Sequence, residues 1–433
     1  MDRSASKYFC MSAWTHLHAL PDGKVIACCL SPMDEPVGDL HREELTDVWN
    51  GERMRELRRN MLADQPTPSI CSRCYSKEEH GLPSLRTGMN AMYADKHAHI
   101  VGSTDPNGRV EDLNLIHWDF RFSNICNLKC RTCGPGFSSA WNDDYKSLYN
   151  PDMDKATFQS HVPKFQRLIR DETRFWEVMT PLFDSVEMIH FAGGEPLIMD
   201  EHYRILNELI TRKQYRVQIR YSTNCSKLVY KGQDVLDLWE KFKKIDLSLS
   251  IDAMDDRFSY VRSGGSWDET RRNLERLRER RDQGRLDGVR WFFHPTISAL
   301  NVMHFLDLHR FLLEEGHIVK DRFFFAPDHY TADVVLNPVI YPDHYNIQML
   351  PASIKARIRD KYQRHAEWAN KKYDFPVEGL MSVVEFMERE DKTEHLPAFI
   401  DITSRLDKIR GEDFTKTFPE MVELFTQRWN FGE

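Results

Sequence analysis

The sequence predicts an α/β protein built on a parallel sheet, with a small cysteine-rich region before it and a helical region after it. From Asp112 to about Tyr330, strand-like segments alternate with helix-like segments. Such alternation implies a parallel sheet with right-handed crossovers, open or closed into a barrel. Five of the nine cysteines lie before residue 90. We therefore divide the chain into a cysteine-rich domain over 1–90, a linker over 91–111, the α/β domain over 112–330 and a helical region over 331–433.

Composition narrows the class of protein. Of the 433 residues, 41% are hydrophobic and 29% are charged, as in ordinary globular proteins. The first residues lack a secretory apolar stretch, and no run approaches the ~18 apolar residues of a membrane span. The net charge of -8 gives no global attraction to nucleic acid. We expect a cytoplasmic protein without a membrane or nucleic-acid partner, in which nine cysteines favour metal ligation or redox chemistry over disulfides.

The cysteine-rich domain is expected to hold a hairpin, a helix and two pairs of cysteines. Pro21 to Gly23 supply the turn, Val25 to Cys29 the returning strand, and Leu45 to Met61 have helical spacing. Four thiolates from two separated pairs can close a tetrahedral zinc site or a four-iron cluster. The stretch from about residue 80 to 112 is rich in Gly, Pro and polar residues, so we expect little structure there.

The remaining elements follow from periodicity and from cap residues. The predicted strands are Leu115–Ser123, Val186–Phe191, Val217–Ser222, Ile245–Ile251, Val289–Ile297 and Arg322–Ala326. The helices expected between them are Phe165–Met179, Glu201–Thr211, Val235–Phe242, Glu269–Arg280 and Val302–Glu315. After the strands we expect helices at Ile354–Trp368, Gly379–Glu388, Phe399–Ile409 and Pro419–Trp429.

Three of these strands carry one polar face, although parallel strands packed on both sides are normally apolar throughout. The first strand places His117, Asp119, Arg121 and Ser123 on one face, and the third and fourth repeat the pattern. This alternation predicts a lumen that is wet or filled by a polar ligand. A sheet with one face in solvent would give the same pattern, but helices in every connection argue against it.

Two motifs point to chemistry. Cys126, Cys130 and Cys133 are separated by three and then two residues, and no fourth cysteine follows nearby. A four-iron cluster on three thiolates keeps one iron open, while a partial zinc site or a chance grouping remains the alternative. Gly193 and Gly194 after the second strand allow close backbone approach to a ligand, and Glu195 can accept hydrogen bonds from an ammonium group.

Together these motifs resemble the CxxxCxxC and GGEP signatures of the radical S-adenosylmethionine (SAM) superfamily. The resemblance implies a partial (β/α)6 barrel and a 4Fe-4S cluster whose open iron binds SAM. It assigns the amino group of SAM to Gly193–Glu195. It also assigns contacts to the ribose and carboxylate of SAM to Ser222, Asn224, Ser250, Asp252 and Arg262. Thr132 departs from the family, in which an aromatic residue often precedes the last cysteine.

The first domain resembles the SPASM/Twitch domains that hold auxiliary iron-sulfur clusters. The resemblance selects Cys10, Cys28, Cys71 and Cys74 as ligands of one auxiliary cluster of the 4Fe-4S type, with Cys29 as the alternative to Cys28. Two departures are that this domain comes first in the chain and that further cysteines of the longer SPASM pattern are missing. A zinc site with four cysteine ligands is the structural alternative.

The resemblance implies reductive cleavage of SAM to a 5′-deoxyadenosyl radical, with electrons from a carrier such as flavodoxin or ferredoxin. A peptide or protein side chain is the first expectation for the substrate and a small molecule the second. Cys225, Asp328 and Tyr330, near strand ends, are candidates for substrate chemistry, although for Cys225 a small buried filler is the more common role. A non-catalytic zinc-stapled scaffold is the rival of another class. His16 and His18, near Cys10, could ligate metal, but histidines in strands or turns usually do not.

Overall fold

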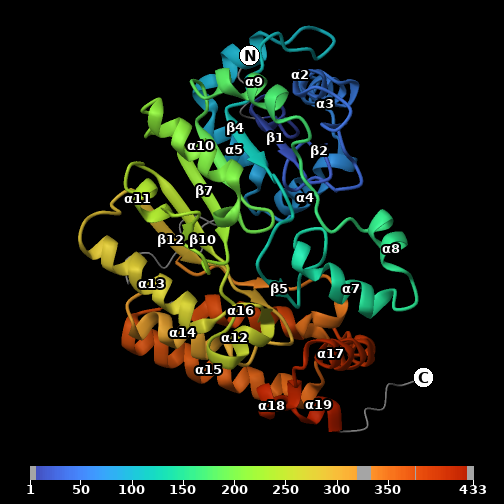
Figure 1. Cartoon of the computed structure of the whole chain (residues 1–433), viewed down its shortest axis with the longest axis vertical. Coiled ribbons are helices and arrows are strands. Elements are labelled where there is room, and N and C mark those ends of the chain that lie inside the picture. Colours follow the sequence, from blue (N-terminus) through green and yellow to red (C-terminus); the bar gives the residue numbers. More distant parts are fainter. Residues whose placement is uncertain (1–5, 319–332, 376, 427–433) are drawn as a thin grey trace.

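The computed structural model describes residues 6–318, 333–375 and 377–426 (Figure 1). A mixed α/β fold surrounds one sheet of eight strands in the order β12-β10-β7-β6-β4-β1-β2-β3. From β12 to β1 all neighbouring strands are parallel, as the alternation of elements predicts. The strands are β1 (His16–Ala19), β2 (Lys24–Ile26), β3 (Gly38–Asp39), β4 (His117–Phe120), β6 (Met188–Phe191), β7 (Gln218–Thr223), β10 (Ile245–Leu249) and β12 (Val289–Phe293). Five of the six predicted strands are thus confirmed; Arg322–Ala326 lies outside the described residues.

The N-terminal hairpin belongs to the same sheet. Strand β1 pairs in parallel with β4, with His16 opposite His117 and His18 opposite Asp119. Strands β2 and β3 extend the sheet beyond β1 in antiparallel pairing. The cysteine-rich region therefore shares its sheet with the α/β domain, and the boundaries that we expect between domains remain a prediction.

The stretch from about residue 80 to 112, where we expect little structure, contains two α-helices. Helices α5 (Leu85–Met92) and α6 (His97–Gly102) lie in the Gly- and Pro-rich stretch. Ser84 begins α5 with a capping box, since its hydroxyl accepts from the Thr87 amide at 3.2 Å while its own amide donates to the Thr87 hydroxyl at 3.1 Å. Met89 and Tyr93 are buried against the core, so this cap and this apolar contact outweigh the loop-like composition.

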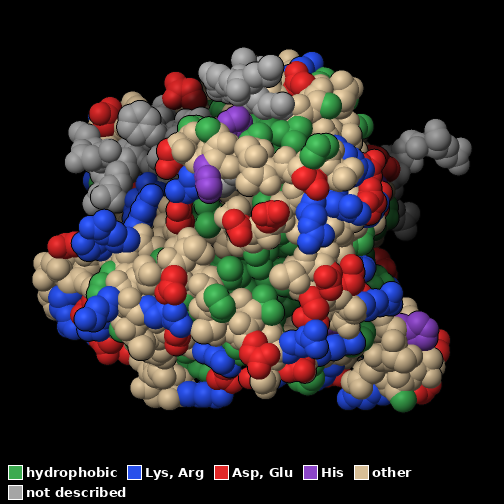
Figure 2. All heavy atoms as spheres, turned by 90° about the horizontal axis from the view of Figure 1, so that it is seen from above, with side chains coloured by type: hydrophobic (Ala, Val, Ile, Leu, Met, Phe, Trp, Pro, Cys, Tyr) green, Lys and Arg blue, Asp and Glu red, His purple; other side chains and the backbone are tan. Residues whose placement is uncertain are grey.

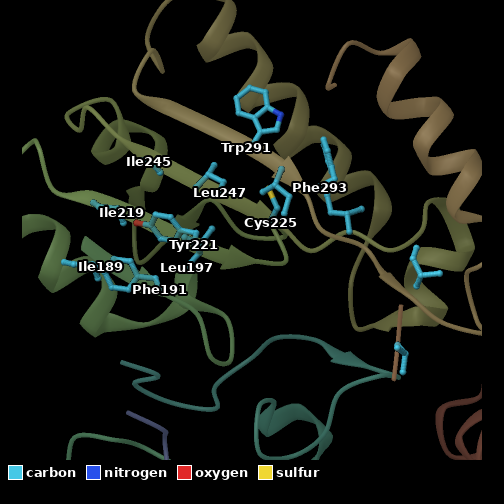
Figure 3. Close-up of a cluster of buried hydrophobic side chains, with 14 of the residues drawn as sticks. Ile189, Phe191, Leu197, Ile219, Tyr221, Cys225, Ile245, Leu247, Trp291 and Phe293 are labelled. Carbon is cyan, nitrogen blue, oxygen red and sulfur yellow. The ribbon is translucent and has the colours of Figure 1, made fainter. Parts of the chain in front are cut away.

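Helices cover the apolar face of the sheet (Figure 1). Phe191, Tyr221, Leu247 and Phe293 project from four neighbouring strands into one buried cluster (Figure 3). The helices that connect the strands are α9 (Glu172–Leu182), α10 (Asp200–Thr211), α11 (Val235–Trp239), α13 (Trp267–Asp282) and α14 (Phe305–Glu314). The polar residues of the same strands face the other way, which confirms the predicted division of the sheet into one apolar and one polar face.

Two predicted helices begin or break elsewhere. The prediction of one helix over Leu45–Met61 is wrong, because Gly51 in extended conformation separates α2 (Leu45–Trp49) from α3 (Glu52–Leu62). The helix expected from Phe165 begins at Glu172 as α9, where the Asp171 carboxylate accepts from the Arg174 amide at 3.0 Å. Further helices are α1 (Ser12–Thr15), α4 (Pro68–Glu79), α7 (Asn142–Tyr149), α8 (Lys155–His161) and α12 (Asp255–Val261).

Helices of the C-terminal region lie across one end of the α/β domain (Figure 1). They are α15 (Ala352–Tyr373), α16 (Val377–Glu388), α17 (Leu396–Arg410), α18 (Phe414–Thr417) and α19 (Glu423–Thr426). These helices confirm the expected helical region, although a 3-10 turn at Pro419–Met421 precedes α19 where one longer helix was predicted. Among the described residues, no helix combines the length and apolar character needed to cross a membrane. On the face shown in Figure 2, acidic and basic side chains are intermixed.

Candidate active site

The three cysteines of the CxxxCxxC motif lie on the loop after β4, which we call the cysteine loop (Cys126–Cys133). All three side chains are partly buried, and burial raises the pKa of each thiol, that of Cys133 to about 12. The proximity of the other thiols raises the pKa of Cys126 further. Cys130 lies in the short strand β5 (Lys129–Cys130), which pairs antiparallel with β11 (Arg262–Ser263). The effect of Cys130 on the pKa of Cys126 and of Cys133 indicates that the three thiols lie near one another.

The glycines of the GGEP segment place this segment directly on the cysteine loop. The Gly194 amide donates to the Ser123 carbonyl at 3.2 Å, and the Glu195 amide donates to the Ile125 carbonyl at 2.8 Å. A Cβ atom on Gly194 would lie 2.0 Å from the Ile125 oxygen. Gly193 has φ +122°, which L side chains rarely adopt. Gly194 therefore permits a close approach to the backbone that begins the cysteine loop, and the expected close approach to a ligand stays a prediction.

Glu195 is 1% exposed and accepts three hydrogen bonds. Its Oε1 accepts from the Thr223 hydroxyl at 2.6 Å and from the Leu197 amide at 3.1 Å, and its Oε2 accepts from the Asn224 amide at 2.8 Å. Burial raises the pKa of this carboxyl, and these donors oppose that shift. A carboxylate has about four acceptor positions, so Oε2 retains one for an ammonium donor.

The ends of β7 and β10 bring polar groups to the same edge of the sheet. The side-chain nitrogen of Asn224 lies 4.0 Å from Cys126 Sγ. It donates a hydrogen bond to the side-chain oxygen Oδ1 of Asn127 at 3.3 Å. Ser222 and the ring of His190 are 3.3 Å apart, and the Ser250 amide donates to the Thr223 carbonyl at 2.8 Å. The structure therefore places Asn224 beside the cysteine loop and Ser222 deeper in the lumen.

Asp252 and Arg262 form a buried ion pair at the cysteine loop. Arg262 Nε lies 2.8 Å from Asp252 Oδ2, and the other carboxylate oxygen accepts from the Thr296 amide at 2.8 Å. A second guanidinium nitrogen, Nη1, lies 3.7 Å from Cys130 Sγ. Arg262 is 7% exposed, so it is no surface loop residue. Asp252 holds Arg262 in the described chain, and its expected contact with the ribose of SAM stays a prediction.

Sequence reasoning missed the residues that tie the cysteine loop to the C-terminal region. Arg131 is buried, stacks on Tyr260 at 3.7 Å and pairs with Asp407 and Glu412. Trp141 donates from its indole nitrogen to the Cys130 carbonyl at 2.7 Å. A cationic residue between two cluster cysteines was the available signal, but its partners lie more than 270 residues away along the chain.

Cys10, Cys28, Cys71 and Cys74 line one small cavity in the N-terminal region, which we call the four-cysteine site. Cys10 and Cys74 are buried and the other two are half-buried, although they come from the hairpin region and from α4. Burial raises the pKa of Cys10 and of Cys71 to about 12, and the neighbouring thiols add to both shifts. Cys29 is exposed and lines a different cavity, so the geometry favours Cys28 over Cys29 at the four-cysteine site.

A second, larger cavity of about 450 Å³ opens on the polar face of the sheet. We call it the lumen cavity. Its polar wall consists of His16, Cys29, His117, Asp119, His190 and Arg220, and Met89 of α5 lies on the opposite side. The sheet register aligns His18, Asp119, Arg220 and Arg290 in one transverse row, completed by His190 and Asp246. The predicted polar lumen is therefore present, and the N-terminal strand supplies two of its histidines.

The remaining candidates for substrate chemistry are not brought to the lumen. Cys225 is 1% exposed and lies among apolar core residues on the helix-covered side of the sheet (Figure 3). Burial raises the pKa of this thiol to about 12. This placement corrects the expectation of a mouth-facing thiol and matches the buried-filler alternative. Asp328 and Tyr330 lie outside the described residues.

Comparison with protein families gives two matches. Residues 120–312 match the radical SAM superfamily, and residues 10–75 match SPASM, described as an iron-sulfur cluster-binding domain. The matched ranges contain the cysteine loop with the GGEP segment and the four-cysteine site, respectively. No curated protein is significantly similar to the chain.

Solved structures give only distant likenesses. SuiB from Streptococcus suis bound to S-adenosylmethionine has 16% identity and a TM-score of 0.32, over 57% of this chain and 43% of SuiB. The same protein bound to its precursor peptide SuiA has 15% identity and a TM-score of 0.31, over 69% of this chain and 59% of SuiB. TYW1 with a lysine-pyruvate adduct has 14% identity and a TM-score of 0.28, over 60% of this chain and 71% of TYW1. These scores are too low to transfer a substrate or a site.

Proposed function

Because the chain belongs to the radical SAM superfamily and carries an N-terminal iron-sulfur cluster-binding domain, we propose that the cysteine loop and the GGEP segment together form its SAM-cleaving centre. This iron-sulfur enzyme uses a 4Fe-4S cluster, S-adenosylmethionine and an auxiliary iron-sulfur cluster. In the proposal Cys126, Cys130 and Cys133 hold the first cluster, and the four-cysteine site holds the auxiliary cluster.

The observation that carries this proposal is the backbone contact between the two motifs. Glu195 N donates to the Ile125 carbonyl at 2.8 Å, one residue before Cys126, so the carboxylate is fixed beside the thiols. The remaining acceptor position of Glu195 Oε2 suits the amino group of SAM. Arg262, held by Asp252 at the Cys130 thiol, is placed to meet the carboxylate of SAM. Thr223 and Asn224 keep Glu195 in position.

A 4Fe-4S cluster held by Cys126, Cys130 and Cys133 would supply the electron for cleavage of SAM to methionine and a 5′-deoxyadenosyl radical, which would take a hydrogen atom from the substrate. The chain supplies positioning and shielding from water. A small electron carrier such as flavodoxin or ferredoxin is the proposed source of the electron for SAM cleavage.

For the substrate, we propose a side chain of a peptide or protein that enters the lumen cavity. Its volume of about 450 Å³ suits one side chain or a small molecule. The iron-sulfur cluster-binding domain, which the sequence resemblance links with peptide modification, favours the peptide. Oxidation of a small molecule in the same cavity is the second candidate, since the cavity lies within the fold and holds a single group of that size.

Anaerobic iron and sulfide analysis, followed by a dithionite-driven assay for 5′-deoxyadenosine, tests the catalytic proposal. The wild type should hold about eight iron atoms in two clusters. The Cys126→Ala/Cys130→Ala/Cys133→Ala variant should hold about four and release no 5′-deoxyadenosine. Cys225→Ala, which alters a cysteine of the core, is the matched control and should keep both clusters. Zinc in place of iron, without SAM cleavage, would support the scaffold alternative instead.

Isotope transfer tests the substrate class. Extract from cells grown on deuterated medium is separated into a fraction of peptides and proteins and a fraction of small metabolites. Each fraction is incubated with the enzyme and unlabelled SAM, and the 5′-deoxyadenosine is analysed by mass spectrometry. Deuterium should appear in 5′-deoxyadenosine with the macromolecular fraction. Label from the metabolite fraction alone would contradict the peptide proposal and leave the catalytic proposal intact.

A further inference from the structure

Two histidines and one carboxylate meet in the lumen on strands that are far apart in sequence. His16 and His18 alternate along β1 and therefore project to the same side, and Asp119 lies opposite His18 on β4. One ligand atom from each of the three side chains lies within 4.8 Å of the others. They are 3%, 6% and 1% exposed, so water does not satisfy them from the surface.

Hydrogen bonding within the protein explains only part of this group. His18 Nδ1 lies 2.8 Å from Asp119 Oδ2, and His190 Nδ1 lies 3.5 Å from the same oxygen. Arg121 Nη2 approaches Asp119 Oδ1 at 2.9 Å. His16 Nδ1 is buried and has no hydrogen-bond partner among the described residues. A buried polar atom of this kind requires an explanation, because its desolvation is uncompensated.

The chemistry of these donors fits a metal ion. A neutral imidazole ligates metals through a ring nitrogen, and His16 Nδ1 is buried without a hydrogen-bond partner among the described residues. Two imidazoles and one carboxylate form the donor set typical of sites for divalent iron or zinc that keep open positions. The lumen cavity is lined by His16 and Asp119, so a ligand in the cavity can reach those positions.

We infer that His16, His18 and Asp119 bind one divalent transition-metal ion, of the iron or zinc class, at the wall of the lumen cavity. Arg121 pairs with the Asp119 carboxylate, since its Nη2 lies 2.9 Å from Oδ1 and donates to Oδ2 at 3.3 Å. Oδ1 has no hydrogen-bond partner among the described residues, and Oδ2 also contacts His18. His190, which contacts both Asp119 and Ser222, supports the carboxylate from the second side. The ion would satisfy His16 Nδ1 and would present a Lewis acid to a heteroatom of the substrate. The inference is independent of SAM cleavage.

Cobalt(II) binding to the intact holoenzyme tests this site. Both clusters are kept in their oxidised, diamagnetic state, Co²⁺ is added anaerobically, and unbound ion is removed. Bound cobalt is then counted by mass spectrometry and observed as high-spin Co²⁺ by electron paramagnetic resonance. The wild type should retain about one cobalt per chain, with nitrogen and oxygen ligands in its spectrum.

Substitutions identify the ligands. His16→Ala, His18→Ala and Asp119→Asn should each weaken cobalt binding at least tenfold while iron and sulfide contents remain those of the wild type. His80→Ala, which changes an exposed histidine of α4's C-terminal end, should leave binding unchanged. Asp119→Asn preserves the shape of the side chain. If an alanine variant loses its iron-sulfur clusters, the cobalt content of Asp119→Asn is the result that tests the site. Equal cobalt in wild type and Asp119→Asn, or no retained cobalt in the wild type, would overturn the inference.

Discussion

The three thiols of the cysteine loop come from eight consecutive residues, whereas the thiols of the four-cysteine site come from segments spread between Cys10 and Cys74. The cysteine loop is nevertheless held by distant parts of the chain: the GGEP segment, Arg262 on β11 and the C-terminal partners of Arg131. The four-cysteine site is enclosed by its own region, including α4 and the start of α5.

This contrast shows that closeness in sequence and structural independence are different properties. A site with three ligands must keep one position open, so its geometry has to be fixed by surroundings that do not fill that position. In a site with four protein ligands, these ligands complete the coordination of the metal centre. The metal centre itself then links the chain segments that supply the ligands. Changes distant in sequence should therefore disturb the cysteine loop, while the four-cysteine site should respond mainly to loss of its own ligands.

The largest effect is expected at Gly194. In Gly194→Ala the added Cβ would lie 2.0 Å from the Ile125 carbonyl oxygen, so the GGEP segment must move away from the cysteine loop. We expect SAM cleavage to fall about 100-fold or more, because misplacement of about 1 Å has effects of this size. Iron analysis should show loss of the first cluster alone. Gly134→Ala, whose Cβ would have no neighbour within 4 Å, is the matched control.

Arg131 tests whether the C-terminal region supports the cysteine loop. Arg131→Ala leaves Asp407 and Glu412 without their buried partner, and we expect a loss of about 3–5 kcal/mol in the free energy of unfolding. SAM cleavage should fall less than in Gly194→Ala. Urea denaturation of the holoenzyme measures the first effect. Lys416→Ala, at an exposed lysine, should change stability by no more than about 0.5 kcal/mol. Equal stability of Arg131→Ala and wild type would contradict this role.

Cys74 tests the independence of the four-cysteine site. In Cys74→Ala, the iron content should fall by one cluster, whereas cleavage of SAM in the absence of substrate should stay close to wild type. Cys29→Ala should keep both clusters, because Cys29 lines the lumen cavity instead. If Cys29→Ala lost the auxiliary cluster and Cys28→Ala did not, the assignment of Cys28 would be wrong.

The smallest effect is expected away from both sites, at His309 on α14. Burial lowers the pKa of His309 to about 3 and that of its neighbour His365 to about 4. As the pH falls below about 6.5, these histidines bind protons in the unfolded chain but not in the folded protein. The free energy of unfolding therefore decreases toward acid pH. His309→Leu should reduce this dependence by up to about 1.4 kcal/mol per pH unit. Denaturation at several pH values measures it, and cluster content should not change.

Much of the fold could be predicted from the sequence, as could the two regions that match the family models. Cys126, Cys130, Cys133 and Glu195 converge because their spacing and the parallel strand order bring them to one edge of the sheet. The four cysteines chosen as ligands of the auxiliary cluster line one cavity, and their role as ligands stays a prediction. Arg131 could not be found, because its meaning depends on partners in a region without recognisable motifs.

The pairing of β1 with β4 could not be predicted from the sequence either. Four-residue strands such as β1 carry no information on which strand they join, and the cysteines suggested a separate unit. The placement of His16 and His18 in the lumen follows from this pairing alone. Nor could the ion pair between Asp252 and Arg262 be predicted, because position at a strand end does not reveal that Arg262 and the Thr296 amide contact the two carboxylate oxygens.

Incorporation of β1 into the central sheet constrains the order of events during protein synthesis. The partner of His18, Asp119, is made 101 residues later, so one edge of the hairpin stays unpaired while the intervening residues leave the ribosome. Contacts of such sequence separation slow folding, and an unpaired edge can associate with other chains. Timely supply of iron to the four-cysteine site would hold this early segment compact until β4 arrives, which links folding yield to iron availability.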